Sequence, residues 1–138
     1  MTLITCIDDR FGLAFHNRRL SRDRALCARV LELAGNGTLR LSPYSLPLFE
    51  GLPHTAALLA GEDYLTQAAG DDFCFAERED LAPWLDRADK LVLFRWNRTY
   101  PFDLRFPAEQ IRNWTPAGTL DFPGCSHEKI TEAAYEKA

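Results

Sequence analysis

The sequence predicts an α/β fold built as a single domain. Its 138 residues match the usual size of one domain. With 46% hydrophobic and 26% charged residues, the composition is ordinary for a globular protein that buries a core. Short apolar runs typical of strands alternate with stretches of helical periodicity, as in folds that layer helices on a sheet. We therefore expect one domain over residues 1–138, without internal repeats.

The first third of the chain predicts two extended segments, a helix and a third strand. Residues 3–7 form an apolar strand, 8–12 a turn, 13–15 a second extended piece and 16–19 a polar loop. Ser21 is the expected N-cap of a helix. Its apolar residues repeat at helical spacing (Leu26, Cys27, Val30, Leu31 and Ala34), and glycines at 35 and 37 end it. A strand at 38–41 follows.

The remainder predicts a β-α-β unit and two extended segments at the end. Ser42-Pro43 begins a short helical turn, and a short strand is expected at 56–59. An apolar strand at 73–76, a short helix capped by Asp80 and a strand at 90–96 make the β-α-β unit. Further extended segments are expected at 114–122 and 130–135, so the chain ends in strands.

Charge and cysteine content limit the classes of function. The formal charge of −4 argues against a protein held on nucleic acid by its overall charge, although a local basic patch remains open. No apolar stretch reaches the roughly 18 to 20 residues that cross a bilayer, and the N-terminus lacks a secretion signal, so a cytoplasmic protein is expected. The four cysteines are widely spaced, which favours free buried thiols over disulfides or a metal site.

Residues 73–107, FCFAEREDLAPWLDRADKLVLFRWNRTYPFDLRFP, resemble the back half of dihydrofolate reductase. The segment aligns without a gap, with Ala88-Asp89-Lys90-Leu91-Val92-Leu93 at the family's strand after the helix and Phe106-Pro107 at its Phe-Pro position. The front is similar too, because Leu3 to Asp8 and then Gly12 resemble the opening strand. The resemblance implies a mixed sheet with flanking helices, and it places Asp23 where a reductase keeps its acid.

Three departures from the reductase pattern concern its chemistry. The family's Gly-Gly pair, which lets the backbone approach the nicotinamide cofactor, is Ala76-Glu77 here, with more acidic residues in 78–80. The arginine that holds the cofactor's phosphate is missing from 42–45, and Phe94 replaces the threonine that supports the acid. We therefore expect the reductase scaffold without its NADPH site and with no cofactor.

Four motifs resemble those of short bacterial proteins often labelled ribonuclease Z. They are Cys-Ile-Asp-Asp at 6–9, Arg-Arg-x-Ser-Arg-Asp at 18–23, Arg-Trp-Asn-Arg-x-Tyr-Pro at 95–101 and Ser-His-Glu-Lys-Ile-Thr at 126–131. That enzyme needs a His-x-His-x-Asp-His zinc motif in a much longer chain. Here His16, His54 and His127 are far apart, so the label implies no chemistry for this chain.

Two arginine clusters are candidates for binding. Arg18, Arg19, Arg22 and Arg24 precede and begin the first helix, where free backbone N–H groups favour an anion. The alternative is a solvated helix start that nearby aspartates neutralise. The cluster at 95–100 combines arginine with Trp96 and an amide, which suits stacking on a ring, or it simply completes a strand and the core.

Three further candidates each have a structural alternative. Residues 126–129 have the residue types of a catalytic set, yet sequence neighbours rarely converge on one atom, so closure of a loop against Asp8-Asp9 is favoured. His16, beside the first arginine cluster, is the histidine best placed for function. Asp23 is either a helix cap or a pocket acid.

The leading hypothesis is a protein that binds a small anionic or ring-containing ligand. Its pocket residues would be Asp8, His16, Arg18, Arg19, Asp23, Tyr44 and Arg95. The alternative is an RNA-binding or RNA-cleaving protein that uses the arginine clusters with His16 or His127, and its affinity would fall steeply with salt. A structural or regulatory partner without a ligand is the third hypothesis. Neither the oligomeric state nor an enzymatic activity follows from the sequence.

Overall fold

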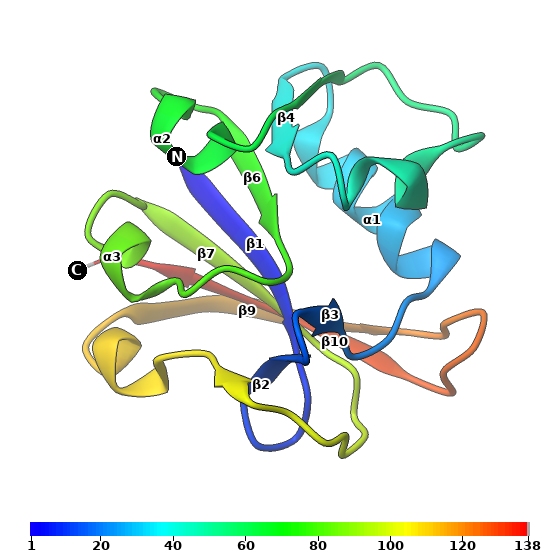
Figure 1. Cartoon of the computed structure of the whole chain (residues 1–138), viewed down its shortest axis with the longest axis vertical. Helices are drawn as coiled ribbons and strands as arrows, with labels where there is room; N and C mark the ends of the chain where they lie inside the picture. The colour runs from blue at the N-terminus through cyan, green and yellow to red at the C-terminus, as the bar shows by residue number, and fades with distance from the viewer. Residues whose placement is uncertain (138) are drawn as a thin grey trace.

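Seven strands form the central sheet of the computed structural model, which describes residues 1–137. Their order is β5-β4-β6-β1-β7-β10-β9. The first five are parallel to one another. At one edge β10 runs antiparallel to β7 and β9 runs antiparallel to β10, so only β10 opposes the direction of the others (Figure 1). The bounds are β1 Thr2–Ile7, β4 Thr38–Leu41, β5 Ala57–Ala60, β6 Phe73–Ala76, β7 Lys90–Arg95, β9 Thr115–Phe122 and β10 Ile130–Glu136. The predicted α/β class with a mixed sheet is confirmed.

A second, three-stranded sheet has the order β3-β2-β8. Its strands are β2 Gly12–Phe15, β3 Arg18–Arg19 and β8 Leu104–Arg105. The sequence predicted a loop at 16–19 and no strand at β8. The chain instead turns at His16 and Asn17, whose φ angles of 51° and 59° suit the tight two-residue turn of a hairpin. Strands of two residues carry too little periodicity to be read from sequence.

The first helix, α1, spans Arg24–Ala34, and its N-cap is Asp23 rather than the predicted Ser21. Asp23 has extended backbone angles, and its carboxylate accepts a hydrogen bond from the N–H of Ala25 at 2.9 Å. Gly35 ends the helix with a φ of 55°, as the glycine-rich sequence predicted. The helix therefore begins two residues later than it would with Ser21 as its cap.

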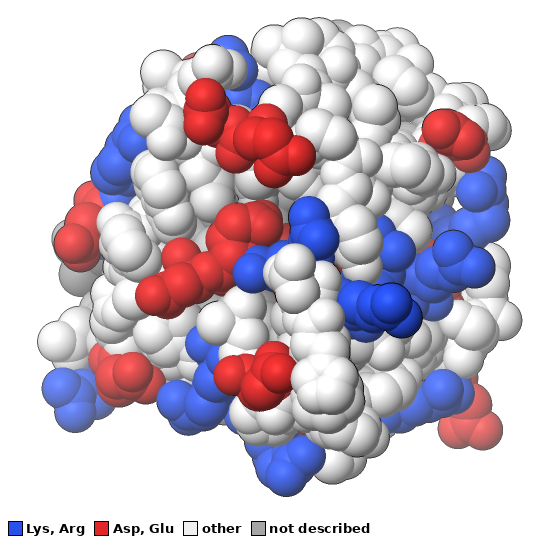
Figure 2. All heavy atoms as spheres, viewed as in Figure 1, with Lys and Arg blue, Asp and Glu red and all other residues white. Residues whose placement is uncertain are grey.

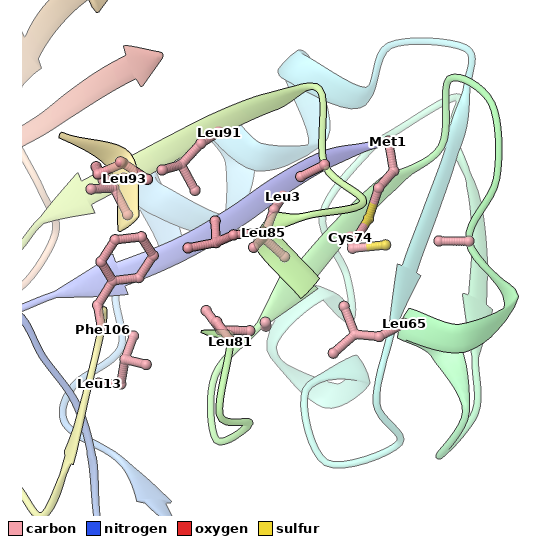
Figure 3. Close-up of a cluster of buried hydrophobic side chains, with 14 of the residues drawn as sticks. Met1, Leu3, Leu13, Leu65, Cys74, Leu81, Leu85, Leu91, Leu93 and Phe106 are labelled. Atoms are coloured by element: carbon pink, nitrogen blue, oxygen red, sulfur yellow. The ribbon is translucent and has the colours of Figure 1, made fainter. Parts of the chain in front are cut away.

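Two apolar clusters fill the two faces of the large sheet. Along β7, Leu91 and Leu93 belong to one cluster and Val92 and Phe94 to the other, so this strand is buried on both faces. The helix α1 and the 3-10 turn η1 (Leu46–Phe49) pack on the face that carries Val92. On the opposite face, shown in Figure 3, lie α2 (Tyr64–Gln67), α3 (Ala82–Leu85) and the 3-10 turn η2 (Ala108–Ile111).

The other predicted elements hold with small shifts. The strand expected at 56–59 is β5, and the segments expected at 114–122 and 130–135 are β9 and β10. The β-α-β unit consists of β6, α3 and β7, with β1 lying between its two strands in the sheet. The N-cap of α3 is Leu81 rather than the predicted Asp80, whose side chain accepts the N–H of Ala82 from one residue before the cap. The helix α2 was not predicted.

Among residues 1–137, no helix combines the length and hydrophobicity that crossing a bilayer requires.

Candidate functional site

A pocket of about 460 Å³ opens beside the start of α1. Its walls come from three segments that are distant in sequence, 19–27, 44–48 and 125–126. An adjoining hollow shares four of these residues and adds Arg18 and Ser21. We call the pocket and the hollow together the arginine pocket. It brings together four of the seven predicted site residues, Arg18, Arg19, Asp23 and Tyr44.

Arginine side chains give this pocket its charge. Basic side chains gather over β3 and the beginning of α1 (Figure 2). Within residues 1–137, no carboxylate lies within 4.0 Å of the guanidinium groups of Arg18, Arg22 or Arg24. Arg24 donates to the backbone carbonyl of Glu50 at 3.2 Å, and all three arginines are exposed. The pocket therefore carries positive charge that the described part of the chain does not neutralise.

Arg19 is the exception, because it forms an ion pair with Glu77. Its Nε donates to Glu77 Oε2 at 2.8 Å and its Nη2 donates to Oε1 at 3.0 Å. Ser45 also donates to Glu77, at 2.7 Å. Although burial opposes the charged form, the Glu77 carboxylate raises the pKa of Arg19. Arg19 thus fixes the pocket wall, and its charge is balanced within the protein.

Tyr44 joins this wall through its ring and its hydroxyl. The guanidinium carbons of Arg19 and Arg78 lie 4.1 and 3.7 Å from the centre of its ring. The hydroxyl accepts the backbone N–H of Arg19 at 3.0 Å. Tyr44 is therefore held rigidly, with protein cations already over its ring.

Asp23 occupies the floor of the pocket and is fully enclosed, its side chain 0% exposed. Besides the N–H of Ala25, its carboxylate accepts the N–H groups of Cys125 at 3.0 Å and Ser126 at 2.8 Å. It also accepts from the Ser126 hydroxyl and lies 3.0 Å from His127 Nδ1. Burial disfavours the charge, but these hydrogen bonds outweigh it and hold the pKa of Asp23 well below its usual range.

His127 continues the network on its other ring nitrogen. Its Nε2 lies 3.1 Å from the Ser21 hydroxyl and 3.1 Å from the Tyr100 hydroxyl. The ring is 1% exposed and stacks on Trp96 with 4.6 Å between ring centres. The sequence drew attention to residues 126–129, but nothing in the spacing indicated Ser21, which lies 106 positions from His127.

Three predicted site residues lie outside the arginine pocket. Asp8 is buried and accepts the backbone N–H groups of Arg10, Gly12 and Tyr100, so it holds a turn. His16 stacks on Phe15 at the exposed tip of a hairpin. Arg95 lies over the Phe11 ring and donates to the Tyr135 hydroxyl at 3.4 Å.

The loop at 126–129 also differs from its expected place. It was predicted to support Asp8-Asp9, and it supports Asp23 instead, because Ser126 and His127 both contact that carboxylate. The chain thus supplies Asp23 with a partner from the C-terminal loop, where the reductase resemblance implied that Phe94 would leave it without one.

The second arginine cluster does not share this pocket. Trp96 is 4% exposed and belongs to the core, which removes it as an open platform for a base. Arg98 donates to the backbone carbonyl of Ser126 at 3.0 Å. Neither Arg95 nor Arg98 lines the arginine pocket. Over the described range 1–137, no group of three metal-ligating side chains is assembled.

Comparison with known proteins shows the fold. No protein-family model matches the sequence, and no curated protein matches it. The structure is similar to that of a dihydrofolate reductase from Enterococcus faecalis complexed with NADP(H) and RAB-propyl, with a TM-score of 0.67 and 10% sequence identity. The match covers 98% of this chain and 94% of that chain. Nothing here supports the resemblance to proteins labelled ribonuclease Z, which stays an expectation from the four motifs. The chain has a dihydrofolate-reductase-like fold.

Proposed function

We propose that this protein binds a small anionic ligand in the arginine pocket. The observation that carries the proposal is the set of guanidinium groups at Arg18, Arg22 and Arg24 around one pocket, without a carboxylate partner among residues 1–137. Arginine groups bind phosphate and carboxylate through paired hydrogen bonds. The pocket's only carboxylate, Asp23, already accepts hydrogen bonds from its neighbours. Its oxygens are therefore occupied by donors of the protein itself.

One wall of the pocket favours a ligand with an apolar part. Pro47 and Leu48 of η1 also line the pocket. A cavity of about 460 Å³ is within the range of small-molecule sites. The Tyr44 ring already has two guanidinium groups over it, so a ring of the ligand would rest on η1 rather than stack on Tyr44.

NADP(H), which the Enterococcus reductase binds, does not fit the residues at the end of β6. Close approach of a pyrophosphate needs small residues and free N–H groups. Here Glu77 follows the strand, buried and held by Arg19 and Ser45. The carboxylate of Glu79, which accepts the Tyr64 hydroxyl, adds a second negative charge nearby in the chain. The proposed ligand is therefore not this cofactor, and no dihydrofolate reduction is expected.

The test is a thermal-shift titration with pyrophosphate, using citrate, ADP and NADPH for comparison. Pyrophosphate should raise the Tm of the wild-type protein, since binding to the folded state stabilises it. The shift should fall as the salt concentration rises. Arg22→Ala should remove most of the shift, because Arg22 lines both parts of the pocket.

Arg112→Ala is the matched control, because Arg112 is an exposed arginine outside the pocket and its loss changes the net charge equally. It should respond to pyrophosphate like the wild type. An equal shift in the Arg22 and Arg112 variants, or no shift with any of these anions, would contradict the proposal. Salt-sensitive binding of mixed-sequence RNA that both variants weaken equally would favour the RNA alternative instead.

A further inference from the structure

We propose that Ser21, His127 and Asp23 form a nucleophilic site, in which the Ser21 hydroxyl attacks an ester carbonyl held in the arginine pocket. The three side chains are connected through two contacts of His127. Asp23 Oδ2 is 3.0 Å from His127 Nδ1, and His127 Nε2 is 3.1 Å from Ser21 Oγ. A hydroxyl is activated for acyl transfer when a serine, a base and a carboxylate that orients the base each lie within hydrogen-bond reach of the next.

The orientation of His127 follows from its surroundings. The enclosed carboxylate of Asp23 can only accept, so Nδ1 carries the hydrogen and donates it. Nε2 then presents its lone pair to Ser21. The stacked Trp96 ring and the 1% exposure of the histidine side chain hold the imidazole in place. His127 is thus fixed as a base, and Asp23 is the positioning residue behind it.

Ser21 stands where a substrate can reach it. It is half-buried and lines the hollow that also contains Arg18, Arg19 and Arg22. The negative charge that develops on a carbonyl oxygen during attack would lie in the hollow that Arg18 and Arg22 line, and their positive charge favours the transition state. Ser21 therefore contacts a base through its hydroxyl and lines a hollow that it shares with arginines.

The Tyr100 hydroxyl also lies 3.1 Å from His127 Nε2. The single lone pair of Nε2 accepts one of the two hydroxyl protons at a time. Tyr100 does not line the arginine pocket, whereas Ser21 does. A substrate in the pocket would consequently meet the serine oxygen.

The reaction balances without any further reagent. The Ser21 oxygen bonds to the carbonyl carbon while its proton passes to His127 Nε2. The bond from that carbon to the ester oxygen then breaks, and the alcohol leaves with the proton from His127. Water next attacks the acyl group, gives its proton to His127 and releases the acid, and Ser21 recovers its proton.

The substrate class rests on the proposed function, because an anionic group on the ester would be held by Arg18 and Arg22. The expected substrate is therefore a small ester that carries a carboxylate or a phosphate. The nucleophile itself can be tested without relying on that anion site.

The decisive experiment treats the full-length protein with a neutral alkyl fluorophosphonate and locates the adduct by peptide mass spectrometry. An activated serine bonds to phosphorus and releases fluoride, so the wild-type protein should carry one adduct on Ser21. Ser21→Ala should carry none, and Thr66→Ala, which removes an exposed hydroxyl from α2, should react like the wild type. His127→Gln should react at least about 100-fold more slowly.

Tyr100→Phe separates this site from a merely structural network. It should be labelled no more slowly than the wild type, since it leaves the Nε2 lone pair to Ser21 alone. An unlabelled wild type, or an adduct on Tyr100 or Ser126, would overturn the proposal. These two overturning results are read on the wild-type protein, so they do not depend on whether any variant folds.

A second assay separates the nucleophile from the anion site. The wild type should hydrolyse the p-nitrophenyl monoester of glutaric acid with a kcat/KM at least about tenfold above that for neutral p-nitrophenyl butyrate. Arg22→Ala should lose this preference, because the anionic group of the glutaric ester then has one guanidinium group fewer to bind. Labelling of Ser21 without the preference would leave the nucleophile in place and contradict the anion site. Pyrophosphate binding without labelling of Ser21 would support the anion site and contradict the nucleophile.

Discussion

The Oδ2 atom of Asp23 lies 3.0 Å from Nδ1 of His127, although the two residues are 104 positions apart. This contact joins the start of α1 to the loop before β10, and both side chains are almost completely enclosed. A carboxylate at that depth is stable only because donors surround it. The same contact therefore supports the fold and positions the candidate site.

The stability of the protein should depend on the ionisation of Asp23. Its pKa is lowered in the folded state, so the unfolded chain binds a proton more readily below about pH 4. The stabilisation is fully present above that pH and is lost as the pH falls toward the folded-state value. Because several hydrogen bonds depend on the carboxylate, Asp23→Asn should cost about 2–4 kcal/mol at pH 7, more than an isolated helix cap.

Urea unfolding of the wild type and Asp23→Asn at pH 7 and pH 3 checks this prediction. The difference in the free energy of unfolding should be smaller at pH 3, because the wild-type carboxylate has then lost part of its advantage. A difference that stays constant over this range would mean that charge on Asp23 contributes nothing.

Gly124 should be intolerant of a side chain. A Cβ atom there would lie 2.5 Å from Asp23 Oδ2 and 2.9 Å from the backbone oxygen of His127, and neither can move freely. Gly124→Ala should destabilise the protein by about 1–3 kcal/mol. Gly61→Ala is the control, since its Cβ meets nothing within 4 Å, and it should change stability by no more than about 0.5 kcal/mol. Thermal unfolding of both variants measures the contrast, and equal melting temperatures would refute it.

The ion pair between Arg29 on α1 and Glu132 on β10 should contribute more than a surface pair. Their Nε and Oε1 atoms are 2.6 Å apart, and the Glu132 side chain is buried. Removing the arginine leaves that carboxylate without its counter-ion, so Arg29→Ala should cost about 1–3 kcal/mol. Arg105→Ala, which breaks the exposed pair with Glu109, should cost less than about 0.5 kcal/mol. Chemical denaturation of both variants gives the comparison, and similar losses would contradict it.

Only one of the four thiols should react quickly in the native protein. Cys125 is exposed. Burial raises the pKa of Cys27 to about 12, with a further contribution from the Glu77 carboxylate. Burial and the Asp72 carboxylate raise the pKa of Cys74 to about 12 as well. Burial also raises the pKa of Cys6. A chromogenic disulfide reagent at pH 8 should therefore titrate one thiol rapidly and the other three after unfolding. Cys125→Ser should remove the rapid phase, and a rapid phase that persists in this variant would show that a buried thiol is accessible.

The sequence determined the layers of this fold. The 3.6-residue spacing of apolar side chains from Leu26 to Ala34 predicts α1, and the continuous apolar run from Leu91 to Phe94 predicts a strand that is buried on both faces. These signals are local, because each depends on which side of one element must avoid water. The two-residue strands β3 and β8 and the single turn α2 escaped prediction, since they contain less than one period of any pattern.

The arginine cluster at the start of α1 was also visible in the sequence, and it is the part of the candidate site that the structure brings together. Asp8, His16 and Arg95 were grouped with this cluster because their residue types suit binding. Residue type alone does not show where a side chain points in the folded protein. The backbone donors that enclose Asp8 and the hairpin that turns His16 outward depend on tertiary contacts.

Only the tertiary structure decided that Ser21, Asp23 and His127 meet. Ser21 and Asp23 lie 106 and 104 positions from the histidine, and β10 brings the loop before it against the start of α1 by pairing with β7. The sequence therefore determined which side chains are buried, because each element must remove its apolar side from water. It also determined the arginine cluster, because those residues are close together in the chain. The alignment of a hydroxyl, an imidazole and a carboxylate depends on the register of distant strands, which no local pattern encodes.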